Sequence, residues 1–377
     1  MLTVSTAILQ QKPADKLTAA EKHYLMRHPA ATVKPEPAKK RLVVATDFCK
    51  TEAEVTAAIR GMGVTNEIFF TKRYPAFADA DGSFSKINLV EYLFERGFLT
   101  DEQRKQGNKL SGGIILWAVY KALAAGVFPV KAGRQTAIYG YTPIRFSTGF
   151  TGKMEGKAAF TTCSLVNPLC LIKMKNPEFV CSQCFAEATA NQYLEGAINW
   201  TQNLFFETCS NLPDILIPLL DRGRRDCHYE KYKSGIRIES YGDTANVQHQ
   251  IFYNKLCEKN SGWLFTQWTK NPAYAVKAFD DYGKPANLKL GLSGYEINKF
   301  PEKIYTKFAK TGYIDFVFLV TNSEDLKMTW LKDLRTLAYP CMCDKNSCAH
   351  LCGECYGKAV PGRLRVVVEM LRPQNKK

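Results

Sequence analysis

Residues 263–292 read WLFTQWTKNPAYAVKAFDDYGKPANLKLGL, and this stretch predicts a strand, a helix and a second strand. Apolar residues dominate 263–268 and 287–292, whereas Pro272 opens an amphipathic run that ends near Asp281. The same alternation continues on both sides, with strands predicted at 235–240 and 313–320 and helices at 245–259 and 301–310. Consecutive strand–helix units require parallel strands, because the crossovers are right-handed. The sequence therefore predicts an α/β fold with a parallel sheet or a partial (β/α) barrel.

Polar residues follow the predicted strands at their carboxyl ends, where sheets of this kind bind ligands. Glu239 lies near the end of the first strand, Asp243 follows that strand, and Lys270 follows the second. Two carboxylates and a lysine suit proton transfer or the binding of a polar molecule, so we predict these three as catalytic residues. Gln267, Thr269 and Ser293 are predicted to line the same pocket. The alternative is that polar residues end strands only because loops meet water.

Nine of the thirteen cysteines fall into two groups, which predicts metal ligands. Cys181 and Cys184, and likewise Cys352 and Cys355, form C-x-x-C pairs that can turn two sulfurs toward one metal. Cys348 adds a C-x3-C-x2-C spacing that suits an iron–sulfur cluster. The first group consists of Cys163, Cys170, Cys181 and Cys184, and the second of Cys341, Cys343, Cys348, Cys352 and Cys355.

The metal and the number of sites stay open at this level. Apolar neighbours such as Phe179, Val180 and Phe185 would shield a redox cluster, which favours one or two [4Fe–4S] clusters over structural zinc. The groups could hold two sites or share one. Disulfides suit small secreted domains, and no N-terminal signal sequence is evident, so we expect a reducing cytoplasm.

The composition predicts a protein with a full core and an anionic partner. The chain has 377 residues, 46% of them hydrophobic, and a formal charge of +15 from 51 Lys and Arg against 36 Asp and Glu. Such a charge favours contact with nucleic acid or a nucleotide. The apolar runs are too short or too interrupted to span a membrane, so no membrane association is expected.

The order of motifs along the chain predicts four regions. Residues 1–42 form a basic arm and linker, 43–150 a small α/β extension, 151–360 the partial barrel with both cysteine groups, and 361–377 a strand and basic tail. Further elements are predicted as strands at 42–47, 67–71 and within 136–148, and as helices at 51–61, 85–97, 114–127, 184–210 and 214–221.

The motifs taken together resemble a known family. A turn closing in Cys-x-x-Cys-Phe-Ala is followed by a long helix, by Arg-Ile-Glu-Ser-Tyr-Gly-Asp, by Phe-Thr-Gln-Trp-Thr-Lys-Asn-Pro and by Cys-Gly-x-Cys-Tyr. This order resembles the gene-product-88-like proteins of phages and mobile elements, over about residues 160–358, and the resemblance implies the cytoplasm of a bacterial host. The resemblance implies that Cys181, Cys184, Cys352 and Cys355 bind metal. It also implies a pocket formed by Gly242, Asp243, Thr269 and Lys270.

A partial barrel with iron–sulfur ligands also resembles, in architecture, the radical S-adenosylmethionine enzymes. The Cys348, Cys352 and Cys355 triplet has that family's spacing, which implies S-adenosylmethionine as a second cofactor. In those enzymes, however, the triplet follows the first barrel strand, and here it follows the last one. The leading hypothesis is an iron–sulfur enzyme acting on or beside nucleic acid or a nucleotide. The alternative is a zinc-stabilised nucleic-acid-binding module without catalysis.

Overall fold

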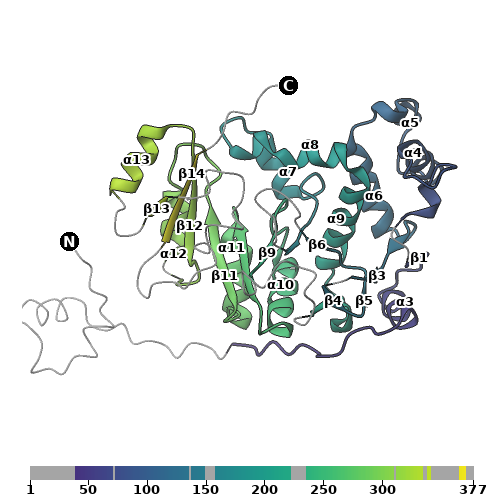
Figure 1. The fold of residues 1–377 in the computed structure, drawn as a ribbon, viewed down its shortest axis with the longest axis horizontal. Helices are drawn as coiled ribbons and strands as arrows, with labels where there is room; N and C mark the ends of the chain where they lie inside the picture. Colours follow the sequence, from purple (N-terminus) through teal and green to yellow (C-terminus); the bar gives the residue numbers. More distant parts are fainter. Residues whose placement is uncertain are drawn as a thin grey trace, which may run out of the picture. The chain divides into compact units, whose positions relative to one another are not determined.

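The computed structural model describes residues 39–70, 73–135, 137–148, 158–221, 235–309, 311–333, 338–340 and 365–370. Residues 41–377 form one compact unit, separate from residues 1–40. Among the described residues, eight strands of this unit form one sheet, in the order β13-β14-β12-β11-β10-β9-β7-β6 (Figure 1). The strands are β6 (Phe146–Thr148), β7 (Ala158–Phe160), β9 (Gly235–Ile238), β10 (Leu264–Thr269), β11 (Leu288–Ser293), β12 (Phe316–Thr321), β13 (Ala338–Pro340) and β14 (Arg365–Met370).

The sheet is parallel except for the antiparallel pair β6 and β7. The predicted alternation of strands and helices over residues 235–321 is confirmed, and so is the parallel sheet. The helices that connect and follow these strands are α10 (Val247–Lys259), α11 (Pro272–Tyr282), α12 (Glu302–Ala309) and α13 (Glu324–Asp333).

The two faces of the sheet have different neighbours. Gln267 of β10 bonds to Gln250 of α10, and Val276 of α11 packs with Leu292 and Leu319. These strand residues share one face by register, which we call the helix face. Side chains alternate along a strand, so the opposite face, which we call the aromatic face, carries Arg237, Thr266, Trp268, Gly291, Ser293, Phe316 and Phe318.

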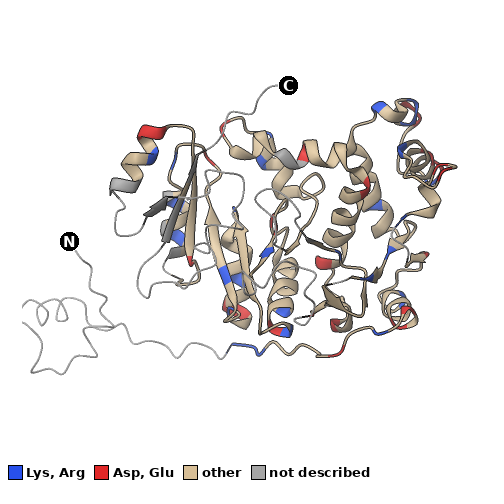
Figure 2. Cartoon of the chain, viewed as in Figure 1, with Lys and Arg blue, Asp and Glu red and all other residues tan. Residues whose placement is uncertain are grey.

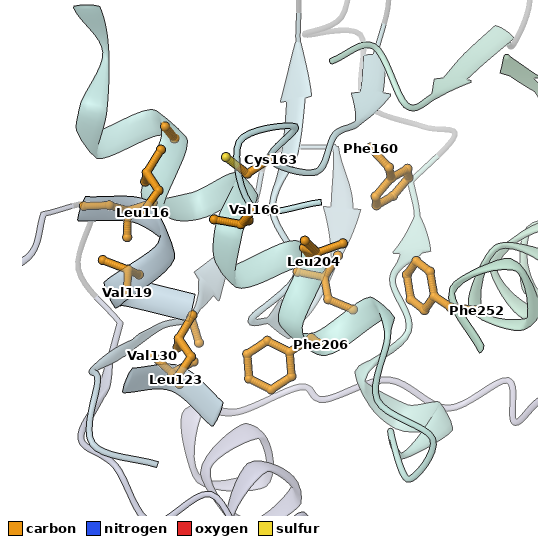
Figure 3. Packing of buried hydrophobic residues seen from close by; sticks show 14 of the residues in the cluster. Leu116, Val119, Leu123, Val130, Phe160, Cys163, Val166, Leu204, Phe206 and Phe252 are labelled. Carbon is orange, nitrogen blue, oxygen red and sulfur yellow. The ribbon is translucent and has the colours of Figure 1, made fainter. Parts of the chain in front are cut away.

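The N-terminal half adds a helical layer around an apolar core. Buried Leu116, Val119 and Leu123 of α6 pack with Leu204 and Phe206 of α9 (Figure 3). Its elements are α3 (Glu52–Gly61), α4 (Lys86–Glu95), α5 (Asp101–Lys105), α6 (Gly112–Ala124), α7 (Pro168–Met174), α8 (Phe185–Gln192), α9 (Leu194–Glu207), and the short strands β1 (Ile68–Phe69), β2 (Val130–Lys131), β3 (Gly133–Arg134), β4 (Ile138–Tyr139), β5 (Tyr141–Thr142) and β8 (Leu219–Leu220).

Three predicted elements are wrong. Residues 42–47 have no regular secondary structure. The helix predicted over 184–210 is two helices, because Tyr193 adopts φ −124° and ψ 60° and Asn191 turns its Oδ1 to the amide of Gly112 at 2.9 Å. The helix predicted over 214–221 is a 3₁₀ turn followed by β8, because Pro218 cannot donate an interior helical hydrogen bond.

The start of α3 gives a test of the local sequence signals. Thr51 and Glu54 form a capping box, in which the Thr51 hydroxyl accepts from the Glu54 amide and the Glu54 carboxylate accepts from the Thr51 amide. We expect Thr51→Ala to lower the free energy of unfolding by about 1 kcal/mol, because an amide at the helix start loses its acceptor. Urea unfolding monitored by circular dichroism measures this; Thr56→Ala, within the same helix, is the control and should change it less.

Candidate functional site at the carboxyl edge of the sheet

The segment that carries Cys181 lies against the carboxyl edge of the sheet. The amide of Val180 donates to the carbonyl of Tyr295 at 2.8 Å, just beyond β11. The Val180 side chain packs against the cluster formed by Phe318 and Val320 on the aromatic face, as does Trp268. The turn that carries Cys181 is therefore held at the edge of the sheet where the sequence places Asp243 and Lys270.

Cys181 and Cys184 lie on a tight turn that leads directly into a helix. The 3₁₀ turn Val180–Gln183 ends with the Cys184 amide donating to the Cys181 carbonyl at 3.1 Å. Helix α8 begins at the next residue, Phe185. The exposed amides of a helix start favour anionic groups, so this turn suits thiolate ligands.

Asp243 makes hydrogen bonds to the end of β10 and to Asn167, the residue that precedes α7. Its Oδ1 accepts from the Thr269 hydroxyl at 2.7 Å, and its Oδ2 accepts from the Lys270 amide at 2.9 Å. The Asn167 side-chain amide donates to the Asp243 carbonyl, while its oxygen caps the start of α7, which carries Cys170. The carboxylate thus has structural partners on both oxygens and fixes the position of Lys270.

The charges of this site interact strongly. Burial lowers the pKa of Lys270, but the Cys181 thiolate, the Asp243 carboxylate and the Cys170 thiolate together raise it above its ordinary value. Burial raises the pKa of the Cys170 and Cys181 thiols. Lys173, whose ammonium lies 3.9 Å from the centre of the Tyr295 ring, has its pKa lowered by burial. Two lysines and the thiols of Cys170 and Cys181 therefore share one partly buried environment.

Glu239 belongs to a different set of contacts. Strand alternation would put its side chain on the aromatic face beside Lys270, but its backbone is left-handed, with φ 57°. Its carboxylate instead meets Tyr253 of α10 at 2.7 Å and the Thr162 hydroxyl at 2.7 Å. Of the three predicted catalytic residues, the structure joins Asp243 and Lys270 by a hydrogen bond and directs Glu239 toward α10.

The Glu239 carboxylate shares a fully buried cluster with Glu207 and His249. His249 Nε2 lies 2.9 Å from Glu207 Oε2 and 3.5 Å from Glu239 Oε1, and the Tyr253 hydroxyl reaches both carboxylates. These ligand atoms lie close enough to hold a metal ion. However, His249 Nδ1 accepts from the Ala245 amide at 3.1 Å. The neutral ring then carries its proton on Nε2 and donates to Glu207, which favours a proton-sharing cluster over a metal centre.

Burial sets the protonation of this cluster. Burial disfavours the charged form of each group. It therefore raises the pKa of Glu239 to about 7 and lowers the pKa of His249 to about 4. Burial also raises the pKa of Glu207 well above its usual range. A neutral histidine between two carboxyls that retain protons near neutrality is the state that the contacts favour.

The remaining predicted pocket residues are divided between the two faces. Gln267 points to the helix face, where it bonds to Thr244 at 2.7 Å and to Gln250. Ser293 shares the aromatic face with Phe318, its register partner. Gly242 closes the loop after β9, since a Cβ there would lie 2.3 Å from the Thr162 hydroxyl and 2.5 Å from Glu239 Oε2.

The described cysteines do not by themselves form the predicted metal site. Among the described residues, no three cysteine sulfurs lie within 4.8 Å of one another. Cys163 lies in the apolar core, where burial raises its thiol pKa to about 11 (Figure 3).

The second cysteine group, Cys341, Cys343, Cys348, Cys352 and Cys355, lies outside the described residues. Pro340, the last described residue before it, ends β13. Strand β13 runs parallel to β14, and β14 to β12, so the chain leaves the sheet at the carboxyl edge. This is the edge at which Lys270 and Cys181 lie.

Sequence reasoning missed Glu207, His249, Tyr253 and Asn167. A signal was present in the helix over residues 247–259, which lies between two apolar strands but places His249, Gln250, Tyr253 and Asn254 on its buried side. Polar residues at that spacing on a core-facing helix indicate a buried polar cluster. Glu207 lies about one turn before the end of the helix predicted over residues 184–210, and no comparable spacing of polar residues marked it.

Comparison with known proteins gives one family. A family model described as gene product 88 matches residues 129–359. No curated protein and no solved structure gives a significant match. The matched span contains both cysteine groups, Glu239, Asp243 and Lys270, and the family resemblance seen in the sequence is confirmed.

Proposed function

The chain belongs to the gene product 88 family. We propose that it is an iron–sulfur enzyme whose active site lies at the carboxyl edge of its sheet. The observation that supports this most is the common environment of Cys170, Cys181 and Lys270 around Asp243. Thiols that could hold a cluster and a lysine that could hold an anionic substrate occur there together. We also propose that the sheet curves into a partial barrel, with these thiols and this lysine at its carboxyl edge.

In this proposal Cys170, Cys181 and Cys184 supply ligands from the first group, and Cys341, Cys343, Cys348, Cys352 and Cys355 supply the rest. The exit of the chain at Pro340, on the same edge, supports one shared site as well as two neighbouring ones. A bound cluster would supply electrons or an open iron, and the Cys348, Cys352 and Cys355 spacing would suit S-adenosylmethionine as cofactor.

The roles of the three polar residues then differ from one another. Lys270 keeps its positive charge and meets the substrate. Asp243 positions Lys270 through the backbone amide, because both of its oxygens already accept hydrogen bonds. Glu239, with a pKa raised by burial to about 7, stores a proton in the cluster with Glu207 and His249. Substrate contact is thus assigned to Lys270 alone.

A nucleic acid or nucleotide partner is supported by where the charge lies. Of the 51 Lys and Arg, 21 fall outside the described ranges, against 8 of the 36 Asp and Glu. Those segments carry +13 of the formal +15, while the described elements mix both signs (Figure 2). None of the described helices is long and apolar enough to cross a membrane. A zinc-stabilised nucleic-acid-binding module without catalysis is the alternative that this charge favours.

Metal content and colour test the proposal. We expect protein purified without oxygen to be brown, to contain iron and sulfide, and to lose most of both in Cys181→Ser and Cys184→Ser, because each loses a thiolate ligand. Cys209→Ser is the matched control: its thiol bonds to the Phe205 carbonyl at 3.1 Å, and its iron content should stay at the wild-type level. A colourless protein with stoichiometric zinc, together with salt-dependent binding of generic DNA or RNA, would establish the alternative instead.

A further inference from the structure

The aromatic face carries two buried polar atoms without a partner in the described part of the chain. Thr266 is 0% exposed, and its Oγ1 has no hydrogen-bond partner. The same is true of Nε1 of Trp268, two residues further along β10. Buried polar atoms are almost always paired, and leaving one unpaired is unfavourable. Two on the same face of one strand indicate a missing partner.

A cation lies beside them. Arg237 of β9 is the register partner of Thr266, so the two side chains lie next to each other on this face. The guanidinium carbon of Arg237 lies 4.7 Å from the centre of the Trp268 ring, and Phe318 packs against that ring at 4.6 Å. A hydroxyl, an indole N–H and a positive charge therefore occupy neighbouring positions on β9 and β10.

The chemistry of these groups defines the partner. An indole N–H can only donate a hydrogen bond, so the partner must offer an acceptor. The nearby guanidinium favours an acceptor that carries negative charge. Lys270 follows Trp268 by two residues, about 7 Å along the strand, and adds a second cation toward the carboxyl edge. Carboxylate and phosphate oxygens meet these requirements, and neutral apolar ligands do not.

We propose that the aromatic face binds a small anion whose carboxylate or phosphate oxygens accept hydrogen bonds from Trp268 Nε1 and Thr266 Oγ1 beside Arg237. Val180 covers the carboxyl end of this face, so the anion lies on the sheet beneath the cysteine segment. The inference concerns the sheet residues only and requires no bound metal. Its failure would leave the metal test unaffected, and the reverse is also true.

Titration with inorganic phosphate and with succinate tests the proposal. Both are added at constant ionic strength, and binding is measured by calorimetry and by the shift in melting temperature. We expect at least one of them to bind the wild type and to bind Trp268→Phe and Thr266→Val about tenfold more weakly, because each variant loses one hydrogen-bonding group. Binding of phosphate alone would identify a phosphate ester as the natural class, and binding of succinate alone a carboxylic acid.

Trp263→Phe is the matched control. Trp263 comes directly before β10, and strand alternation assigns it to the face opposite Thr266 and Trp268, so the variant should bind the anion with wild-type affinity. Without ligand, Thr266→Val should be at least as stable as the wild type, because it removes an unpaired buried hydroxyl. The proposal is overturned if neither anion binds the wild type, or if Trp268→Phe and Thr266→Val bind as tightly as Trp263→Phe.

Discussion

Gly242→Ala is expected to lower the free energy of unfolding by about 3 kcal/mol, as overpacking of a filled interior does. The new methyl group would lie 2.3 Å from the Thr162 hydroxyl, 2.5 Å from Glu239 Oε2 and 3.0 Å from the Thr162 carbonyl. None of these atoms can retreat easily, because Thr162 binds the Glu239 carboxylate through both its amide and its hydroxyl. Denaturant unfolding measures the loss.

The matched control for this variant is Gly196→Ala. Gly196 lies in the first turn of α9, and a methyl group there would meet only the Tyr193 Cβ at 4.0 Å. Alanine should stabilise that helix by up to about 1 kcal/mol, so the two Gly→Ala changes are expected to have opposite signs. Equal stability of Gly242→Ala and the wild type would mean that the loop after β9 does not close on Glu239 as described.

Glu239→Gln is expected to change the way stability depends on pH. Burial raises the pKa of Glu239 from 4.5 to about 7. Between these values the folded protein holds a proton that the unfolded chain has released, so this group's contribution to stability falls as the pH rises. The fall over the whole window is about 3 kcal/mol. The glutamine variant lacks this fall, and its stability relative to the wild type should rise by that amount from pH 4.5 to pH 8.

His249 acts in the opposite direction in the same cluster. Burial lowers the pKa of His249 from 6.5 to about 4, so its contribution to stability increases with pH across that window. Between pH 4.5 and 6.5, the rise due to His249 therefore offsets part of the fall in stability due to Glu239 in the wild type. The difference in free energy of unfolding between the wild type and Glu239→Gln isolates the Glu239 contribution. Urea titrations at several pH values give the measurement. Glu258→Gln, at an exposed position of α10, is the control; if its difference from the wild type followed the same curve, the assignment to Glu239 would be wrong.

Much of the sheet could be predicted because each strand between residues 235 and 321 is an apolar run followed by a helix start. Asn246 caps the helix that begins at Val247, and Pro272 is the first residue of the next helix. The edges of the fold were harder to predict. Residues 42–47 have the composition of a strand, but the described residues give them no strand partner. Strand pairing is a tertiary property, and composition alone does not supply it.

The candidate site was predicted in position and only partly in membership. Asp243, Thr269 and Lys270 come together because parallel strands end at one edge, which the sequence pattern implies. Glu239 was grouped with them because alternation puts it on their side. The left-handed backbone of Glu239 reverses that orientation. Neither the residue type nor its sequence neighbours indicate a positive φ at this position. His249 and Glu207 were missed because they meet only after two helices have packed.

The place of β14 has a consequence for how the protein is made. Residues 365–370 insert between β12 and β13, although β13 precedes them by some distance in the chain. A ribosome that has released residue 340 has therefore exposed β12 with a bare edge, and among the described strands β13 pairs only with β14, which has not yet emerged. Open edges of that kind invite pairing with other chains. Messages truncated shortly before codon 365 should thus yield aggregates rather than a slightly shortened protein.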